Sequence, residues 1–174
     1  MRVLAAAALA LLTAACGFQL RGQAKLPFET LYVAIPAISP LGIELKRNII
    51  AGTHTRLVDD PAQAQAILEL VSEERDKSIL SFDTTGRVRE LQLRYRLSFR
   101  VRDARGRDYL PQSEIRVTRD ISFNDTQVLS KESEEQLLYR DMQSDMVQQI
   151  LRRLAAAPAE PVAFEPGAND AAAR

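Results

Sequence analysis

Residues 91–102 read LQLRYRLSFRVR, the most regular pattern in the chain. Apolar and polar residues alternate through it without a break, which is typical of a β-strand with one face in a core and the other in water. The pattern predicts that Leu97 and Phe99 both point inward. The apolar set is Leu91, Leu93, Tyr95, Leu97, Phe99 and Val101, and the polar set is Gln92, Arg94, Arg96, Ser98, Arg100 and Arg102.

A turn sequence stands on each side of this strand. Residues 83–86 read DTTG and residues 103–106 read DARG, and stretches of this kind between apolar runs predict hairpin turns. We therefore expect three consecutive strands in an antiparallel meander. The apolar residues that share one parity in the outer runs are Ala66, Leu68 and Leu70 before the strand, and Ile115, Val117, Ile121 and Phe123 after it.

Two helices are expected to bracket these strands. Ser39 and Pro40 supply an N-cap and a first helical residue, and an apolar stripe then continues to Gly52. The last helix is expected to open with a capping box at residues 133–136, which read SEEQ. The apolar stripes are Leu41, Leu45 and Ile49 in the first helix, and Leu138, Met142, Met146, Ile150 and Leu154 in the last.

Short β-rich runs at residues 31–35 and 56–58 complete the order of elements. Strand, helix, several antiparallel strands and helix is the order of an α+β protein. The sequence therefore predicts a two-layer sandwich, in which a mostly antiparallel sheet of about four strands carries two helices on one face.

The amino terminus is an export signal. After Met1 and Arg2, thirteen residues are apolar apart from Thr13, and the run stops at the chain's one cysteine, Cys16. This run is shorter than the roughly 20 residues of a membrane-spanning helix and has the length of a secretory signal. Small residues lead into Cys16, which is the pattern of a bacterial lipobox.

We expect residues 1–15 to be removed and Cys16 to carry the lipid that holds the protein on a membrane. Gly17 follows it in place of an inner-membrane retention aspartate, so outer-membrane sorting is expected.

The carboxyl terminus differs from the rest of the chain. Residues 158–174 contain Pro158, Pro161, Pro166 and Gly167 and have no apolar period, which predicts a disordered tail. Residues 16–157 are then expected to form one α+β domain, large enough to bury about two thirds of its surface.

Composition excludes several function classes. Lys+Arg and Asp+Glu are 23 each, and the chain has no Trp, which argues against nucleic acid as a partner. One histidine, His54, follows the first helix in an expected loop, so we interpret it as a solvated loop residue. Without a second histidine or a free thiol, no catalytic triad or metal site is predicted. We predict no cofactor and no enzymatic activity.

Positive charge concentrates around the central strand. Residues 87–107 hold eight arginines and two acids, Glu90 and Asp103. One interpretation is ordinary cross-strand ion pairing with acids of the preceding run, namely Glu69, Glu73, Glu74 and Asp76. The other is that arginines at the strand ends and the turn bind phosphate, which a guanidinium contacts at two points. For an outer-membrane lipoprotein, the nearby phosphates belong to lipopolysaccharide.

Two short motifs carry a family resemblance. Residues 16–22 read CGFQLRG, and Phe123 and Asn124 precede the triplet at 130–132, which reads SKE. With the order of elements, these motifs resemble the LptE family of lipopolysaccharide-assembly lipoproteins over nearly all of residues 1–155. The resemblance implies a plug that sits in the lumen of the β-barrel LptD, anchored by its lipid in the inner leaflet, while the pair places lipopolysaccharide in the outer leaflet.

The resemblance also implies particular lipopolysaccharide contacts. Family members use one basic residue at a hairpin tip and one before the last helix. Lys131 occupies the second position, while Thr84 stands at the first, so Arg87 and Arg89 are the candidates there. The mid-strand cations Arg94, Arg96, Arg100 and Arg102 are candidates for contact with acids or with the barrel wall.

The resulting hypothesis is a non-enzymatic outer-membrane lipoprotein with an LptD-like barrel and lipopolysaccharide as partners and a membrane anchor at Cys16. A lipid carrier or adaptor of another envelope system is the alternative, and it would require an apolar cavity. A cell-wall enzyme is the third hypothesis.

Overall fold

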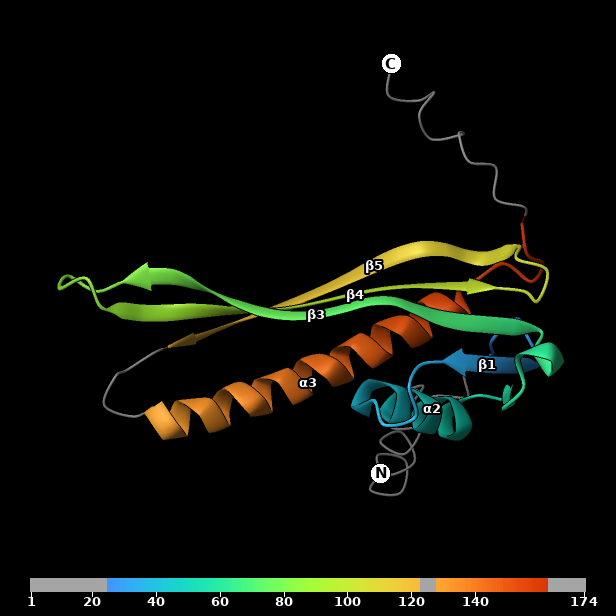
Figure 1. The fold of residues 1–174 in the computed structure, drawn as a ribbon, viewed down its shortest axis with the longest axis horizontal. Helices are drawn as coiled ribbons and strands as arrows, with labels where there is room; N and C mark the ends of the chain where they lie inside the picture. Colours follow the sequence, from blue (N-terminus) through green and yellow to red (C-terminus); the bar gives the residue numbers. More distant parts are fainter. Residues whose placement is uncertain (1–24, 123–127, 163–174) are drawn as a thin grey trace, which may run out of the picture.

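The computed structural model describes residues 25–122 and 128–162 (Figure 1). Five strands form one mixed sheet within these residues, in the order β2-β1-β3-β4-β5. β1 pairs in parallel with β2 and β3, and the pairs β3–β4 and β4–β5 are antiparallel. The strands are β1 (Thr30–Ala34), β2 (Arg56–Leu57), β3 (Ala66–Phe82), β4 (Val88–Arg102) and β5 (Asp108–Ser122).

The predicted α+β class and the antiparallel meander are confirmed, with five strands in place of about four. The run expected at residues 56–58 forms the fifth strand, β2, which has only two residues and pairs at the sheet edge beside β1. Its pairing is parallel because α2 (Pro40–Gly52) carries the chain back across the sheet between the two strands. A short 3-10 helix, η1 (Pro61–Gln63), then leads into β3.

The start of α2 lies where the sequence predicts it. Ser39 is the N-cap, its side-chain oxygen accepts a hydrogen bond from the backbone N–H of Gly42 at 3.3 Å, and Pro40 follows at the first position. Gly42 is required for close packing, since a Cβ there would lie 2.9 Å from Cγ2 of Ile35. The helix therefore sits close against the end of β1.

The predicted start of the last helix is wrong. Helix α3 (Val128–Ala155) begins five residues before Ser133, so the expected capping box lies inside the helix. Residues 128–132 contain no proline or glycine, so nothing in them prevents the helix from starting before Ser133. The Nζ of Lys131 also donates a 3.2 Å hydrogen bond to Oγ of Ser122, which links this first turn to the end of β5. Lys131 therefore lies in α3, not before it.

The core lies between one face of the sheet and the two helices, as predicted. Leu93, Tyr95, Leu97, Phe99 and Val101 are fully buried on β4. On α3 the predicted stripe is buried at Met142, Met146, Ile150 and Leu154, and Leu138 is partly buried. Figure 1 shows α2 and α3 on the same side of the sheet, while the opposite sheet face carries no helix of the described chain.

β3 has different pairing partners along its length. β1 pairs with β3 only as far as Glu69, and a bulge follows between Leu70 and Ser72. Beyond the bulge, β3 continues with β4 alone into a long hairpin that extends past the first turn of α3 (Figure 1). We call residues 66–70 the proximal half of β3 and residues 72–82 its distal half.

The C-terminal boundary differs from the prediction at its first residues. Val162 forms an antiparallel bridge with Asp108 through two backbone hydrogen bonds, and Ala157 is buried. Residues 158–162, expected to begin a disordered tail, thus include a segment paired with β5. Several other predictions lie outside the described residues: the predicted signal sequence at residues 1–15, Cys16, Phe123–Asn124 and residues 163–174.

Candidate functional site

The hairpin tip is held by one carboxylate. Asp83 accepts hydrogen bonds from the backbone N–H of Thr85 at 2.8 Å, from the Thr85 hydroxyl at 2.7 Å and from the backbone N–H of Arg87 at 2.9 Å. The Thr85 hydroxyl and the Arg87 amide together hold the pKa of Asp83 below its usual value. Gly86 supplies the positive φ of 80° that closes the turn. The backbone of Arg87 is fixed in this way, while its side chain is exposed.

The three cations predicted to bind lipopolysaccharide lie at the same end of the molecule. The Arg89 side chain is 67% exposed, and its Nη2 is 3.9 Å from the Glu90 carboxylate. Lys131 lies on α3, but its contact Ser122 is the β5 residue paired with Glu90. Lys131 is also bound at 2.8 Å to Glu134 and is largely covered, at 17% exposed. Arg87 and Arg89 are thus the more accessible of the three.

Apolar side chains accompany these cations at the tip. Ile79, Leu80 and Phe82 of β3 are 49%, 50% and 58% exposed. The sequence pattern did not identify them as an exposed surface. One signal was available, because Ile79 and Leu80 are consecutive and cannot both face a core from a single strand.

The open sheet face is covered by a ladder of ion pairs. Arg94 bonds Asp76 at 2.7 Å, and Arg96 bonds Glu74 at 2.8 Å. Near the end of β1, the Glu69 carboxylate receives both Arg100, at 2.6 Å, and Arg102, at 2.5 Å. The hydrogen bond from Arg102 is the main cause that holds the pKa of Glu69 below its usual value. The mid-strand arginines therefore have cross-strand partners from the set of acids named in the sequence analysis.

Glu73 does not belong to this ladder. It lies on the helix-facing side, where its Oε1 accepts a hydrogen bond from the Tyr95 hydroxyl at 2.6 Å and one from Arg75 at 3.1 Å. Its expected pairing with an arginine of β4 is therefore wrong, because the bulge at Leu70/Ser72 shifts the parity of the distal half.

Arg75 is the centre of a polar network that the sequence analysis missed. It donates to Tyr95 at 2.9 Å and to Gln143 of α3 at 3.1 Å, and its guanidinium carbon lies 4.4 Å from the Tyr95 ring centroid. Gln143 donates in turn to Glu44 of α2 at 2.8 Å. Burial raises the pKa of the Tyr95 hydroxyl. The network joins β3, β4, α3 and α2, and no sequence motif marks it.

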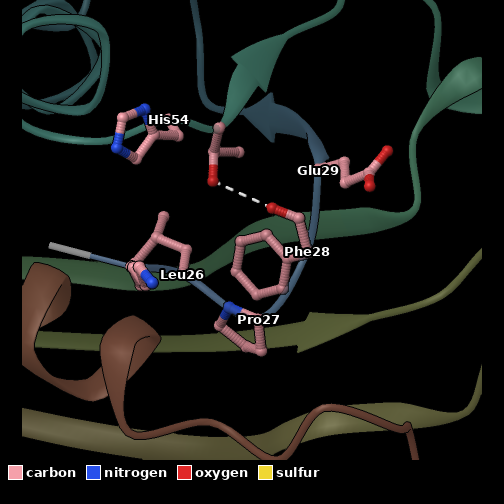
Figure 2. A pocket seen from close by; sticks show the side chains of 7 residues that line it. Leu26, Pro27, Phe28, Glu29 and His54 are labelled. Carbon is pink, nitrogen blue, oxygen red and sulfur yellow. Dashed lines mark hydrogen bonds between the residues drawn. The ribbon is translucent and has the colours of Figure 1, made fainter.

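A shallow pocket of about 270 Å³ lies where the described chain begins. Figure 2 shows His54 beside Leu26, with the Thr55 hydroxyl donating to the Phe28 carbonyl at 2.9 Å. The lining residues are Lys25, Leu26, Pro27, Phe28, Glu29, His54 and Thr55. His54 is exposed in a loop, as predicted.

The described ranges contain two α-helices, α2 and α3. Neither helix there is long and apolar enough to span a bilayer. Among residues 25–122 and 128–162, no three histidines or carboxylates gather as a metal site.

Residues 28–154 match the family model described as LptE, lipopolysaccharide-assembly. The match takes in every strand and all but the last residue of α3, well over half of the chain. The chain belongs to the LptE family. Cys16, which we predict to carry the lipid, lies outside the matched range.

Relatives and solved structures agree with this assignment. The LPS-assembly lipoprotein LptE of Photorhabdus laumondii is 26% identical over 83% of this chain and 79% of its own length, and that of Pectobacterium atrosepticum is 28% identical over 83% and 79%. A solution structure of lipoprotein B from Nitrosomonas europaea is 45% identical, with a TM-score of 0.70 over 80% of this chain and 91% of that one. The rare lipoprotein B of Shewanella oneidensis, at 23% identity and a TM-score of 0.65 over 73% of this chain and 94% of that one, shares the fold.

Proposed function

We propose that this LptE-family chain is a non-enzymatic, lipid-anchored partner of an LptD-like outer-membrane β-barrel. Acyl chains on Cys16 hold it at the periplasmic leaflet, and the domain occupies the barrel lumen. In this position it supports barrel folding and contacts lipopolysaccharide on its way to the outer leaflet.

The observation that carries the lumen proposal is the open sheet face. It runs along β3, β4 and β5, has no helix over it in the described chain, and presents side chains whose charges are already paired. The lumen of a large outer-membrane barrel is polar, and an uncovered polar face can enter it without burying unpaired charge. A lipid carrier would instead require an enclosed apolar cavity, whereas the His54 pocket is shallow and, at about 270 Å³, below the roughly 300–1,000 Å³ of common ligand sites.

A bulky substitution on the open face tests the lumen proposal. Thr118 is exposed on β5 opposite Arg94, so Thr118→Trp adds volume there without removing an ion pair. Affinity capture of the full-length variant from detergent-solubilised outer membranes should recover much less barrel protein than the parent does. Asp59→Trp, at an exposed position beyond β2, is the control and should recover it normally. Equal recovery by both variants would argue against the open face as the contact surface.

The anchor has a separate test. Cys16→Ser removes the sulfur that the lipid requires, so the chain should become uncleaved or soluble in the periplasm of cells that lack the barrel partner. Normal processing and membrane retention of Cys16→Ser in those cells would contradict acylation.

The lipopolysaccharide contact rests on the hairpin end, where Arg87 and Arg89 lie beside exposed apolar side chains. A triple variant with Arg87, Arg89 and Lys131 changed to alanine should bind purified lipopolysaccharide more weakly, and the difference should shrink at high salt because screening weakens the contacts of the parent. The charge-matched control changes the exposed cations Arg105, Arg116 and Arg152, which lie elsewhere. Parent-like binding by the hairpin variant at low salt would leave the plug role without this contact.

A further inference from the structure

The outward side of α2 carries large apolar residues that nothing in the described chain covers. Ile43 and Ile50 are 53% and 66% exposed, and their spacing of seven residues places them on one side of the helix. Ile38, directly before the N-cap, is 89% exposed. Buried Leu41, Leu45 and Ile49 occupy the opposite side, so α2 has an apolar surface on both sides.

The basic and acidic residues of α2 lie on different sides of the helix. Lys46 and Arg47 lie between the two exposed isoleucines in the sequence, three and four residues after Ile43. Glu44, the one acid of α2, faces α3, where its carboxylate accepts hydrogen bonds from Gln143 at 2.8 Å and Ser144 at 2.7 Å. The outward side therefore combines isoleucine and positive charge without an acid of the same helix.

The position of α2 relates this surface to the proposed anchor. The described chain begins at Lys25, whose pocket is shared with His54, two residues after the last residue of α2. Eight residues lie between Cys16 and Lys25, and the nine steps from one Cα to the next reach about 30 Å when fully extended. Figure 1 shows α2 in the half of the molecule opposite the hairpin tip. A membrane that holds Cys16 is thus within reach of α2.

We propose that α2, at the end of the molecule opposite the hairpin tip, stays outside the lumen at the periplasmic mouth of the barrel. Its outward side lies in the headgroup region of an anionic phospholipid bilayer, with Ile43 and Ile50 inserted and Lys46 and Arg47 directed to lipid phosphates. The inference rests on the acylation of Cys16 proposed above. Helices with an apolar side and flanking cations take this position on membranes. The methylene stem of a lysine or arginine side chain can stay buried while its charged end reaches the phosphates. A second copy of the chain would bring Lys46 and Arg47 of both copies together, which like-charge repulsion opposes.

Site-directed spin labelling tests this contact on the mature, acylated chain. Acylated Cys16 has no free thiol, so a single introduced cysteine takes the label in Ile43→Cys, Ile50→Cys or the control Gln136→Cys, which lies at an exposed position of α3. The protein is reconstituted in vesicles of phosphatidylethanolamine and phosphatidylglycerol. Labels at 43 and 50 should collide more often with oxygen, which partitions into lipid, than with a water-soluble nickel chelate, and the label at 136 should show the reverse. In the Ile43→Cys protein, Lys46→Gln with Arg47→Gln should shift the label toward the value at 136.

The outcomes separate this proposal from the anchor. Protein that floats with the vesicles while the labels at 43 and 50 remain as water-exposed as the label at 136 would overturn the α2 contact and leave the anchor standing. Loss of flotation would overturn both. Dipolar broadening between labels at position 43 of different copies would assign the surface to self-association instead, and it would likewise overturn the bilayer contact.

Discussion

The two halves of β3 lie in one sheet and face the same helix layer, yet they are held by different interactions. In the proximal half, Ala66 and Leu68 are fully buried against β1, β4 and the helices. In the distal half, the residues on that side include Glu73, Arg75 and Lys77, which reach α3 and β4 through hydrogen bonds and ion pairs. The bulge at Leu70/Ser72 is the boundary between the two.

The difference indicates where the stability of the fold resides. Burial of apolar area stabilises a domain by about 25 cal/mol per Å², whereas a typical hydrogen bond contributes a net 0.5–1.5 kcal/mol or so. We infer that the proximal half, with β1, α2 and the C-terminal part of α3, holds the molecule together. The distal half can then present exposed apolar and cationic groups at its tip without a large penalty to the fold.

The largest expected effect comes from a matched pair of leucines on β3. Leu68→Ala empties a fully buried site in the proximal half and should lower the free energy of unfolding by about 2–5 kcal/mol. Leu80→Ala, in the distal half, removes a side chain that is already 50% exposed and should change it by about 0.5 kcal/mol or less. Urea denaturation followed by circular dichroism measures both. Similar losses at the two positions would remove the distinction between the halves.

The second prediction concerns the polar network of the distal half. Tyr95→Phe keeps the buried ring but removes the hydroxyl that bonds Glu73 and Arg75, so it should lower the free energy of unfolding by about 1–3 kcal/mol. Tyr139→Phe removes one bond, to the Asp76 carbonyl at 3.0 Å, and should have a smaller effect. A double-mutant cycle with Arg75→Met should show coupling to Tyr95, since the two side chains share partners. Additive losses would mean that the network does not act as a unit.

The sequence predicted the apolar core better than the polar distal half of β3, for a physical reason. Apolar periodicity reports burial, so β4, the core stripe of α3 and the capped start of α2 were all predicted correctly. The charged run from Glu73 to Lys77 has no apolar period. Which acid faced which side depended on a bulge that no residue pattern marks, and this is why Glu73 was misassigned.

The candidate site shows the same limit. The turn at residues 83–86 was predicted from its Asp and Gly, but the apolar tip and the contact between Lys131 and Ser122 depend on long-range packing. The start of α3 was placed late because the pattern Ser-x-x-Gln fits a helix interior as well as a cap, and a capping box alone does not exclude an earlier turn of helix.

The third prediction uses two equivalent turns at opposite ends of β4. Gly86 and Gly106 have φ values of 80° and 84°, each donates its N–H to the aspartate three residues earlier at 3.1 Å, and a Cβ at either position would meet nothing within 4 Å. Gly86→Ala and Gly106→Ala should therefore each lower the free energy of unfolding by about 1 kcal/mol through backbone strain alone. Equal shifts in thermal unfolding would show that the two turns are equally strained by a Cβ, although they lie at opposite ends of β4. A clearly larger loss at one turn would contradict this.

The smallest expected effect is a pH dependence at the boundary between the halves. Glu69 has a folded-state pKa below its usual value because Arg102, and after it Arg100, donates hydrogen bonds to its carboxylate. A lowered pKa means that the folded state favours the charged carboxylate, so the stabilisation is present above the usual pKa of glutamate and is lost as pH falls through the lowered value. Glu69→Gln should thus be slightly less stable than the parent at neutral pH, by about 1 kcal/mol or less for a partly exposed pair, and the difference should close under acid conditions. Denaturant midpoints measured from neutral to acidic pH give the comparison. Glu74→Gln, with one arginine partner and a side chain 58% exposed, should lower the free energy of unfolding at neutral pH by less than Glu69→Gln does. The stability difference between the parent and Glu69→Gln could instead stay constant from neutral to acidic pH. That result would mean that the two arginines do not prefer the charged form of Glu69.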